Sequence, residues 1–106
     1  MAMDFEKLMR QAQQMQEQMS KAQEELAHET VEASAGGGMV TVKATGALQI
    51  TEIKIAKEAI DPDDPEMLAD MVLAAVNEAL RSAQGLVESR LGGMMGGLGG
   101  LGLPGL

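Results

Sequence analysis

The stretch Met39–Ile55, MVTVKATGALQITEIKI, contains the pattern that decides the fold. Val40, Val42 and Ala44 alternate with polar residues, which is the period of a strand that is covered on one face. Gly46-Ala47 is a plausible tight turn, and a second run of alternating apolar residues follows it. The stretch therefore predicts two antiparallel strands joined by a hairpin.

The second of these strands carries an irregularity. Its apolar residues change phase after Ile50, which predicts a bulge near Thr51-Glu52. Upstream, Thr30–Ala35 precedes the glycine run Gly36–Gly38 and is placed to form another strand. Together the three segments predict a three-stranded antiparallel meander.

A helix-forming segment precedes the meander, from Asp4 to about His28, without glycine or proline. Its apolar residues are spaced alternately by three and four, which is the heptad pattern of a narrow contact with another helix. The alternative is an ordinary amphipathic helix that packs on its own domain. The apolar residues, called here the heptad seam, are Phe5, Leu8, Ala12, Met15, Met19, Ala22 and Leu26.

A second helix is predicted after the meander. Asp63 and Glu66 have the spacing of a capping box, and Pro65 suits a first helical turn. The helix should end at about Leu91, because glycines follow. Its apolar residues cover an arc of about 200°, which is wider than one three-stranded sheet requires.

These segments define an α+β fold in the order α-β-β-β-α, a meander flanked by two long helices. Residues 1–91 should form a single domain, and Gly92–Leu106, with eight glycines and no charge, a flexible tail. The heptad seam and the wide apolar arc of the second helix both need a further surface, and they therefore predict a homodimer.

The composition restricts the cellular compartment and the kinds of partner that we expect for this protein. The chain has no cysteine, and its first ten residues, MAMDFEKLMR, lack the basic and apolar segments of a signal peptide. The tail is too short and too rich in glycine to span a membrane. We therefore expect a cytoplasmic protein with no membrane partner. The formal net charge of −8 argues against a polyanionic partner unless basic residues gather locally.

The sequence offers little for catalysis or metal binding. His28 is the single histidine, and no cysteine could join it as a metal ligand. Four acidic residues before the second helix could bind a cation through oxygen, but helix capping also explains them, and they lack EF-hand spacing. No serine is accompanied by a recognisable catalytic base. We expect no enzymatic activity, cofactor, metal or small-molecule substrate. The four acidic residues are Asp61, Asp63, Asp64 and Glu66.

The first helix carries a cationic stripe that is separate from the heptad seam. At about 100° per residue, five basic and amide side chains fall within an arc of about 80°, and the acidic residues Glu6, Glu17 and Glu24 fall on an adjoining arc. Lys, Arg and Gln side chains reach phosphate oxygens, and the stripe is about 21 Å long. The alternative is a solvated face with mixed charge pairs. The stripe consists of Lys7, Arg10, Gln14, Gln18 and Lys21.

Several segments resemble one known family. The Met/Gln-rich run LMRQAQQMQEQM, the segments GGGMVTVKATG and EIKI, and above all DPDDPEMLADMVLAAVNEAL at Asp61–Leu80 are similar to the YbaB/EbfC family of bacterial nucleoid-associated proteins. The glycine- and leucine-rich tail is similar to tails in that family. The resemblance covers nearly the whole chain.

The resemblance implies a homodimer whose helices project like the arms of tweezers and embrace double-stranded DNA. It also implies a cytoplasmic protein on the nucleoid that alters DNA conformation, influences gene expression and has no enzymatic activity. The candidate DNA contacts are Lys7, Arg10 and Lys21, supported by Gln14 and Gln18, and none obviously reaches base edges, so little sequence specificity is expected. The competing hypothesis is a protein-interaction adaptor that uses the Met-rich helix and the tail without binding DNA, which the net charge favours.

Overall fold

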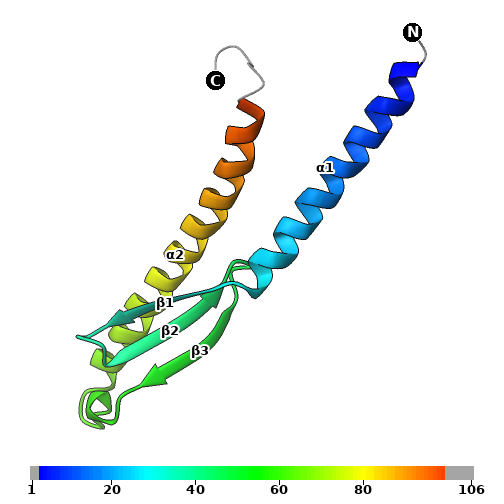
Figure 1. The fold of residues 1–106 in the computed structure, drawn as a ribbon. Coiled ribbons are helices and arrows are strands. Elements are labelled where there is room, and N and C mark those ends of the chain that lie inside the picture. The colour runs from blue at the N-terminus through cyan, green and yellow to red at the C-terminus, as the bar shows by residue number, and fades with distance from the viewer. Residues whose placement is uncertain (1–2, 100–106) are drawn as a thin grey trace.

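The computed structural model describes residues 3–99 of the chain, and the predicted order α-β-β-β-α is confirmed (Figure 1). One short 3₁₀ helix, η1, precedes the second long helix. The elements are α1 Met3–His28, β1 Thr30–Ala35, β2 Val40–Thr45, β3 Ile50–Ile55, η1 Lys57–Ala59 and α2 Pro65–Gly99.

The strands form an antiparallel sheet in the order β1-β2-β3, as predicted. Between β2 and β3, Lys43 pairs with Glu52 but Ala44 pairs with Ile50, so Thr51 is an extra residue on β3. The bulge predicted near Thr51-Glu52 is therefore confirmed. It restores the phase of the apolar residues, because Ile50 and Ile53 then lie on the same face of the sheet.

The predicted hairpin turn at Gly46-Ala47 is present. The Leu48 amide donates a hydrogen bond of 2.9 Å to the Thr45 carbonyl, and Leu48 itself adopts a positive φ of 61°. A turn followed by a left-handed residue is a common way to close a short hairpin loop. The β2–β3 hairpin therefore closes through a short loop although the loop lacks an Asn-Gly pair.

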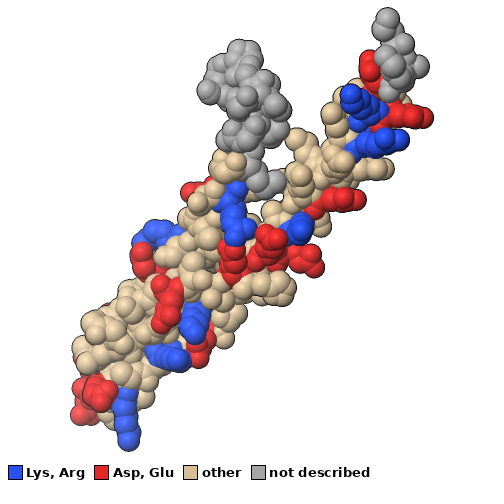
Figure 2. Space-filling model, viewed as in Figure 1, with Lys and Arg blue, Asp and Glu red and all other residues tan. Residues whose placement is uncertain are grey.

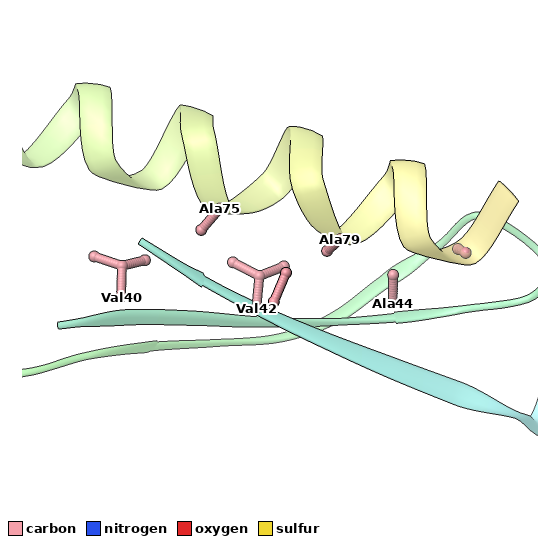
Figure 3. Close-up of a cluster of buried hydrophobic side chains, with 7 residues drawn as sticks. Val40, Val42, Ala44, Ala75 and Ala79 are labelled. Atoms are coloured by element: carbon pink, nitrogen blue, oxygen red, sulfur yellow. The ribbon is translucent and has the colours of Figure 1, made fainter. Parts of the chain in front are cut away.

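The core lies between the sheet and α2. Val40, Val42 and Ala44 of β2 point at Ala75 and Ala79 of α2, and all five are fully buried (Figure 3). Alanine on the helix lets its backbone approach the sheet closely, so that short valine side chains fill the space between them. The core is therefore built without aromatic residues.

The helix α2 does not cover the whole sheet. It lies over β1 and β2 and scarcely touches β3. The register places Ile53 and Ile55 on the same face as Val42 and Val40, yet both isoleucines are exposed. The apolar arc of α2 is also only partly used, since Leu73 is exposed. Within the described chain, an apolar surface therefore remains along β3 and one side of α2.

Both ends of α2 differ from the prediction. Asp64, rather than Asp63, is the capping residue, because its Oδ1 accepts a hydrogen bond of 3.2 Å from the Met67 amide. Pro65 is the first helical residue, and Asp61 Oδ1 accepts from the Asp63 amide in the preceding turn. The capping box of Asp63 and Glu66 was therefore wrong by one residue.

The far end of α2 continues to Gly99, beyond the predicted end at about Leu91. Glycine can adopt helical φ and ψ, and in a helix it costs about 1 kcal/mol relative to alanine, so a few glycines lower helix stability without forbidding the helix. Residues 100–106 lie outside the described part of the chain, and the flexibility predicted for the tail from Gly92 stays a prediction.

The molecule is elongated because both long helices extend beyond the sheet. Figure 1 shows α1 and the C-terminal half of α2 projecting to the same side, with the sheet packed on the N-terminal half of α2. The principal extents are 76 × 27 × 16 Å, and the radius of gyration is 20.7 Å. A compact chain of this length would have a radius of gyration of about 13 Å.

Candidate nucleic-acid interface

The helix α1 is attached to the rest of the described chain only near its C-terminal end. Residues 4–21 are all exposed, whereas Leu26 is 4% exposed. The Gly46 amide donates hydrogen bonds to the carbonyls of Leu26 (2.9 Å) and Glu29 (3.1 Å). Leu26 lies in the last turn of α1, where carbonyls lack a partner within the helix, and Glu29 directly follows the helix, so the β2–β3 turn caps α1 and joins it to the sheet.

This attachment needs glycine at position 46. A Cβ atom built on Gly46 would lie 2.3 Å from the Leu26 carbonyl oxygen, which is far inside van der Waals contact. The contact is with backbone, so no side chain could rotate away to relieve it. Gly46 therefore serves two purposes, because it forms the hairpin turn and also allows α1 to approach it.

The cationic stripe lies on the projecting part of α1. Its five residues are all exposed, and helical periodicity places them along one side of α1. Among residues 3–99, no salt bridge involves Lys7, Arg10 or Lys21. The structure therefore leaves these three charges available to a ligand, and the DNA contact itself stays a prediction.

One basic residue contacts α1 near the stripe, and this contact could not be predicted from the sequence. Arg90, on α2, donates from one guanidinium nitrogen to Glu25 at 3.4 Å and from the other to Glu29. Eighteen residues, about five helical turns, separate Lys7 from Glu25, so Glu25 lies on the same side of α1 as the stripe. The position of the Glu25 carboxylate at the end of the stripe is the feature of the sequence that could have indicated an ion pair here. Nothing in the sequence identifies Arg90 as its partner.

The charges at the other end of the molecule differ in sign. The residues between η1 and α2 are acidic, and they lie at the end of the molecule opposite to the free end of α1. Figure 2 shows basic and acidic groups side by side along α1, both near its free end and where α1 approaches α2. Because α1 carries five acidic residues against three basic ones, a polyanion could be attracted only along the cationic stripe, and it would be repelled from the start of α2.

The acidic residues before α2 have local structural roles. Asp61 and Asp64 accept backbone hydrogen bonds in the turn and the helix cap. Across residues 3–99, no three His, Asp or Glu side chains are grouped so that they could hold a metal ion. His28 is exposed at the end of α1.

The heptad seam is exposed along most of its length. Phe5 is 68% exposed and Leu8 61%, and Met15 and Met19 are also exposed, whereas Leu26 is buried at the base of α1. The seam and the cationic stripe lie on different sides of α1. An apolar seam of this length on a projecting helix is a surface that another apolar element could cover.

No helix within the described part of the chain combines the length and the apolar character required to cross a lipid bilayer.

The chain is similar to known bacterial proteins over nearly its full length. The model of the YbaB/EbfC DNA-binding family matches residues 1–98. A nucleoid-associated protein of Acetivibrio thermocellus is 59% identical over 99 residues, covering 93% of this chain and 86% of the relative. A nucleoid-associated protein of Chloroflexus aurantiacus is 52% identical over 99 residues, covering 93% of this chain and 99% of the relative.

A solved structure shares the fold. The crystal structure of an uncharacterised protein from Helicobacter pylori matches with a TM-score of 0.74, covering 86% of this chain and 96% of that chain. At 20% sequence identity this likeness concerns the fold alone. Because the family model spans residues 1–98 and the relatives are this similar, the chain belongs to the YbaB/EbfC DNA-binding family.

Proposed function

We propose that this protein is a homodimeric nucleoid-associated protein that binds duplex DNA through α1 with little sequence specificity. By binding, it would alter DNA conformation and thereby influence nucleoid organisation and gene expression in the bacterial cytoplasm. The proposal involves no catalysis and no cofactor. Family membership and relatives named nucleoid-associated proteins support DNA as the ligand.

The observation that carries the proposal is the cationic stripe on a helix that projects from the domain. Lys7, Arg10 and Lys21 are all exposed on α1. Lysine and arginine bind phosphate through charge, and the intervening glutamine amides can donate to phosphate or sugar oxygens. The net charge of −8 is compatible with this contact, because screening confines each charge to about 8–10 Å.

The composition of the stripe accounts for the low specificity that we propose. Contacts to phosphate position a protein on the duplex without reading bases. Base discrimination then depends on how easily a sequence is bent or on the width of its grooves. We therefore expect unrelated duplexes of equal length to bind with similar affinity.

The exposed apolar surfaces support the homodimer. In a second subunit, the seam residues Phe5, Leu8, Met15 and Met19 would find an apolar partner, and methionine suits such contacts because it is flexible and fills irregular gaps. A dimer would also double the number of stripes. Three cations per chain then give six per dimer, which raises the affinity for a polyanion.

The test is binding to several unrelated duplexes, measured by fluorescence anisotropy at low salt. Wild type should bind all of them, and Lys7→Gln/Arg10→Gln/Lys21→Gln should lose about tenfold or more in affinity on every duplex. The substitutions retain helix propensity, so the variant should fold. Arg81→Gln on α2 is the matched control, since Arg81 pairs with Glu78 at 2.5 Å and lies outside the stripe. Unchanged binding by the triple variant would exclude the stripe as the contact.

The exposed heptad seam together with the net charge favours one alternative, a protein-interaction adaptor that does not bind DNA. The same titration separates the two functions. If wild type binds no duplex even at low salt, the adaptor explains the exposed seam and DNA binding is excluded.

A further inference from the structure

We infer that Arg90 is a positioning residue: by pairing with Glu25 and Glu29 it fixes the direction of α1 relative to α2, and with it the location of the cationic stripe. The effect on DNA rests on the proposed function. The effect on helix direction does not, because it concerns the protein alone.

Few contacts hold α1 to the rest of the described chain. The sheet holds its end through the Gly46 amide, which bonds to the Leu26 and Glu29 carbonyls, and through the buried Leu26 side chain. These contacts all lie at one end of α1 and involve one turn of the sheet. A helix held at one end by one turn can still tilt about it, so a contact to a second element is needed to fix its direction.

Arg90 supplies that second contact, from α2. One guanidinium nitrogen bonds to Glu25 and the other to Glu29, and both pairs join residues more than sixty positions apart in the chain. Arginine has a planar group with several donors in fixed directions, so it can hold two carboxylates together. Lysine has a single ammonium on a flexible stem and would hold them less rigidly.

The length of α1 amplifies small changes at its base. Lys7 lies about 27 Å from Glu25 at 1.5 Å per residue. A tilt of about 10° at the base would therefore move Lys7 by about 5 Å, which exceeds the length of a hydrogen bond of about 3 Å to a phosphate oxygen. Without the Arg90 ion pairs, the stripe residues would therefore occupy a range of positions wider than a hydrogen bond to phosphate allows.

The rotational position of α1 is also determined at this site. Glu25 and the stripe lie on the same side of α1, and Glu25 contacts α2 through Arg90. The stripe therefore faces the side on which α2 lies.

The ion pairs are partly exposed, so they should affect direction more than stability. The Arg90 side chain is 39% exposed, and those of Glu25 and Glu29 are 53% and 34% exposed. Solvent screens such pairs, and their net contribution to folding is small. Arg90→Gln should therefore melt within a few degrees of wild type, at nearly the same temperature as Arg81→Gln.

The first test measures helix direction without DNA. The chain has no cysteine, so Gln13→Cys on α1 and Gln84→Cys on α2 give two unique, exposed sites for spin labels. Excess unlabelled protein restricts the distances to one chain. Arg90→Gln should broaden the distance distribution, Arg90→Lys should broaden it less, and Glu25→Gln/Glu29→Gln should match Arg90→Gln. Arg81→Gln should leave it unchanged. An unaltered distribution in Arg90→Gln would overturn the inference.

The second test distinguishes positioning from direct contact. If Arg90 only positions α1, Arg90→Gln should lower the affinity for duplex DNA about two- to fivefold, which is the range expected for loss of an exposed ion pair. The dependence of the affinity on salt concentration should be unchanged. A direct phosphate contact predicts that the salt slope falls by about 2 per dimer, and this result would contradict the positioning role. Broadened distances in a protein that binds no DNA would support the inference while refuting the proposed function.

Discussion

At the scale of single residues, two groups determine where α1 lies. Gly46 brings the β2–β3 turn within hydrogen-bonding distance of the helix end, and Arg90 connects the same helix end to α2. Both act through the last turn of α1, far from the stripe that we propose to bind DNA. Residues outside an interface can therefore control its geometry.

Gly46→Ala should destabilise the fold by about 1–3 kcal/mol, because the added methyl group would meet the Leu26 backbone and separate the turn from α1. Urea denaturation measures the change. The matched control is Gly85→Ala, the same chemical change in the middle of α2, where nothing lies within 4 Å of the new Cβ. It should stabilise the protein by about 0.5–1 kcal/mol, through better helix propensity. Equal effects of the two changes would contradict the role assigned to Gly46.

At the scale of elements, sequence patterns predicted the features that depend on interactions between residues close in the chain. The alternation at Val40, Val42 and Ala44 identified a strand, and the phase change after Ile50 located the bulge at Thr51. The cap was wrong by one residue, because Asp63 and Asp64 can both act as caps and the turn stabilised by Asp61 decides between them. The helix end was placed too early because glycine disfavours a helix without preventing it.

Interactions between elements far apart in the chain could not be predicted from the sequence. The position of α2 over β1 and β2 depends on how the core alanines meet the sheet, and it leaves Ile53 exposed on β3. The pairing of Arg90 with Glu25 depends in turn on where the two helices approach each other. The stripe residues could be named from helical periodicity, whereas the residue that orients them could not.

The heptad seam belongs to this scale as well. If it packs in a dimer, Met15→Glu/Met19→Glu would place charges in an apolar contact, and the dimer dissociation constant should rise at least about a hundredfold. Sedimentation equilibrium measures the constant. Gln14→Glu/Gln18→Glu, with the same charges one residue away on the stripe, should leave the dimer intact. A monomeric wild type, or equal effects of both variants, would contradict dimerisation through the seam.

At the scale of the whole molecule, shape and charge act together. The elongated fold holds the stripe away from the acidic residues that precede α2, over a long dimension of 76 Å. The length of the molecule exceeds the screening length in physiological salt several times, so the acidic end does not cancel the field near the free end of α1. A protein with a net charge of −8 can in this way present a basic stripe along one side of a helix.

The salt dependence of DNA affinity tests the central claim most directly, because it counts the phosphates that are neutralised. With six cations per dimer in contact, the logarithm of the association constant should fall against the logarithm of salt concentration with a slope of about −5. Lys7→Gln/Arg10→Gln/Lys21→Gln should give a slope near zero. A wild-type slope near zero, or a triple variant that keeps the wild-type slope, would contradict the claim that α1 binds DNA.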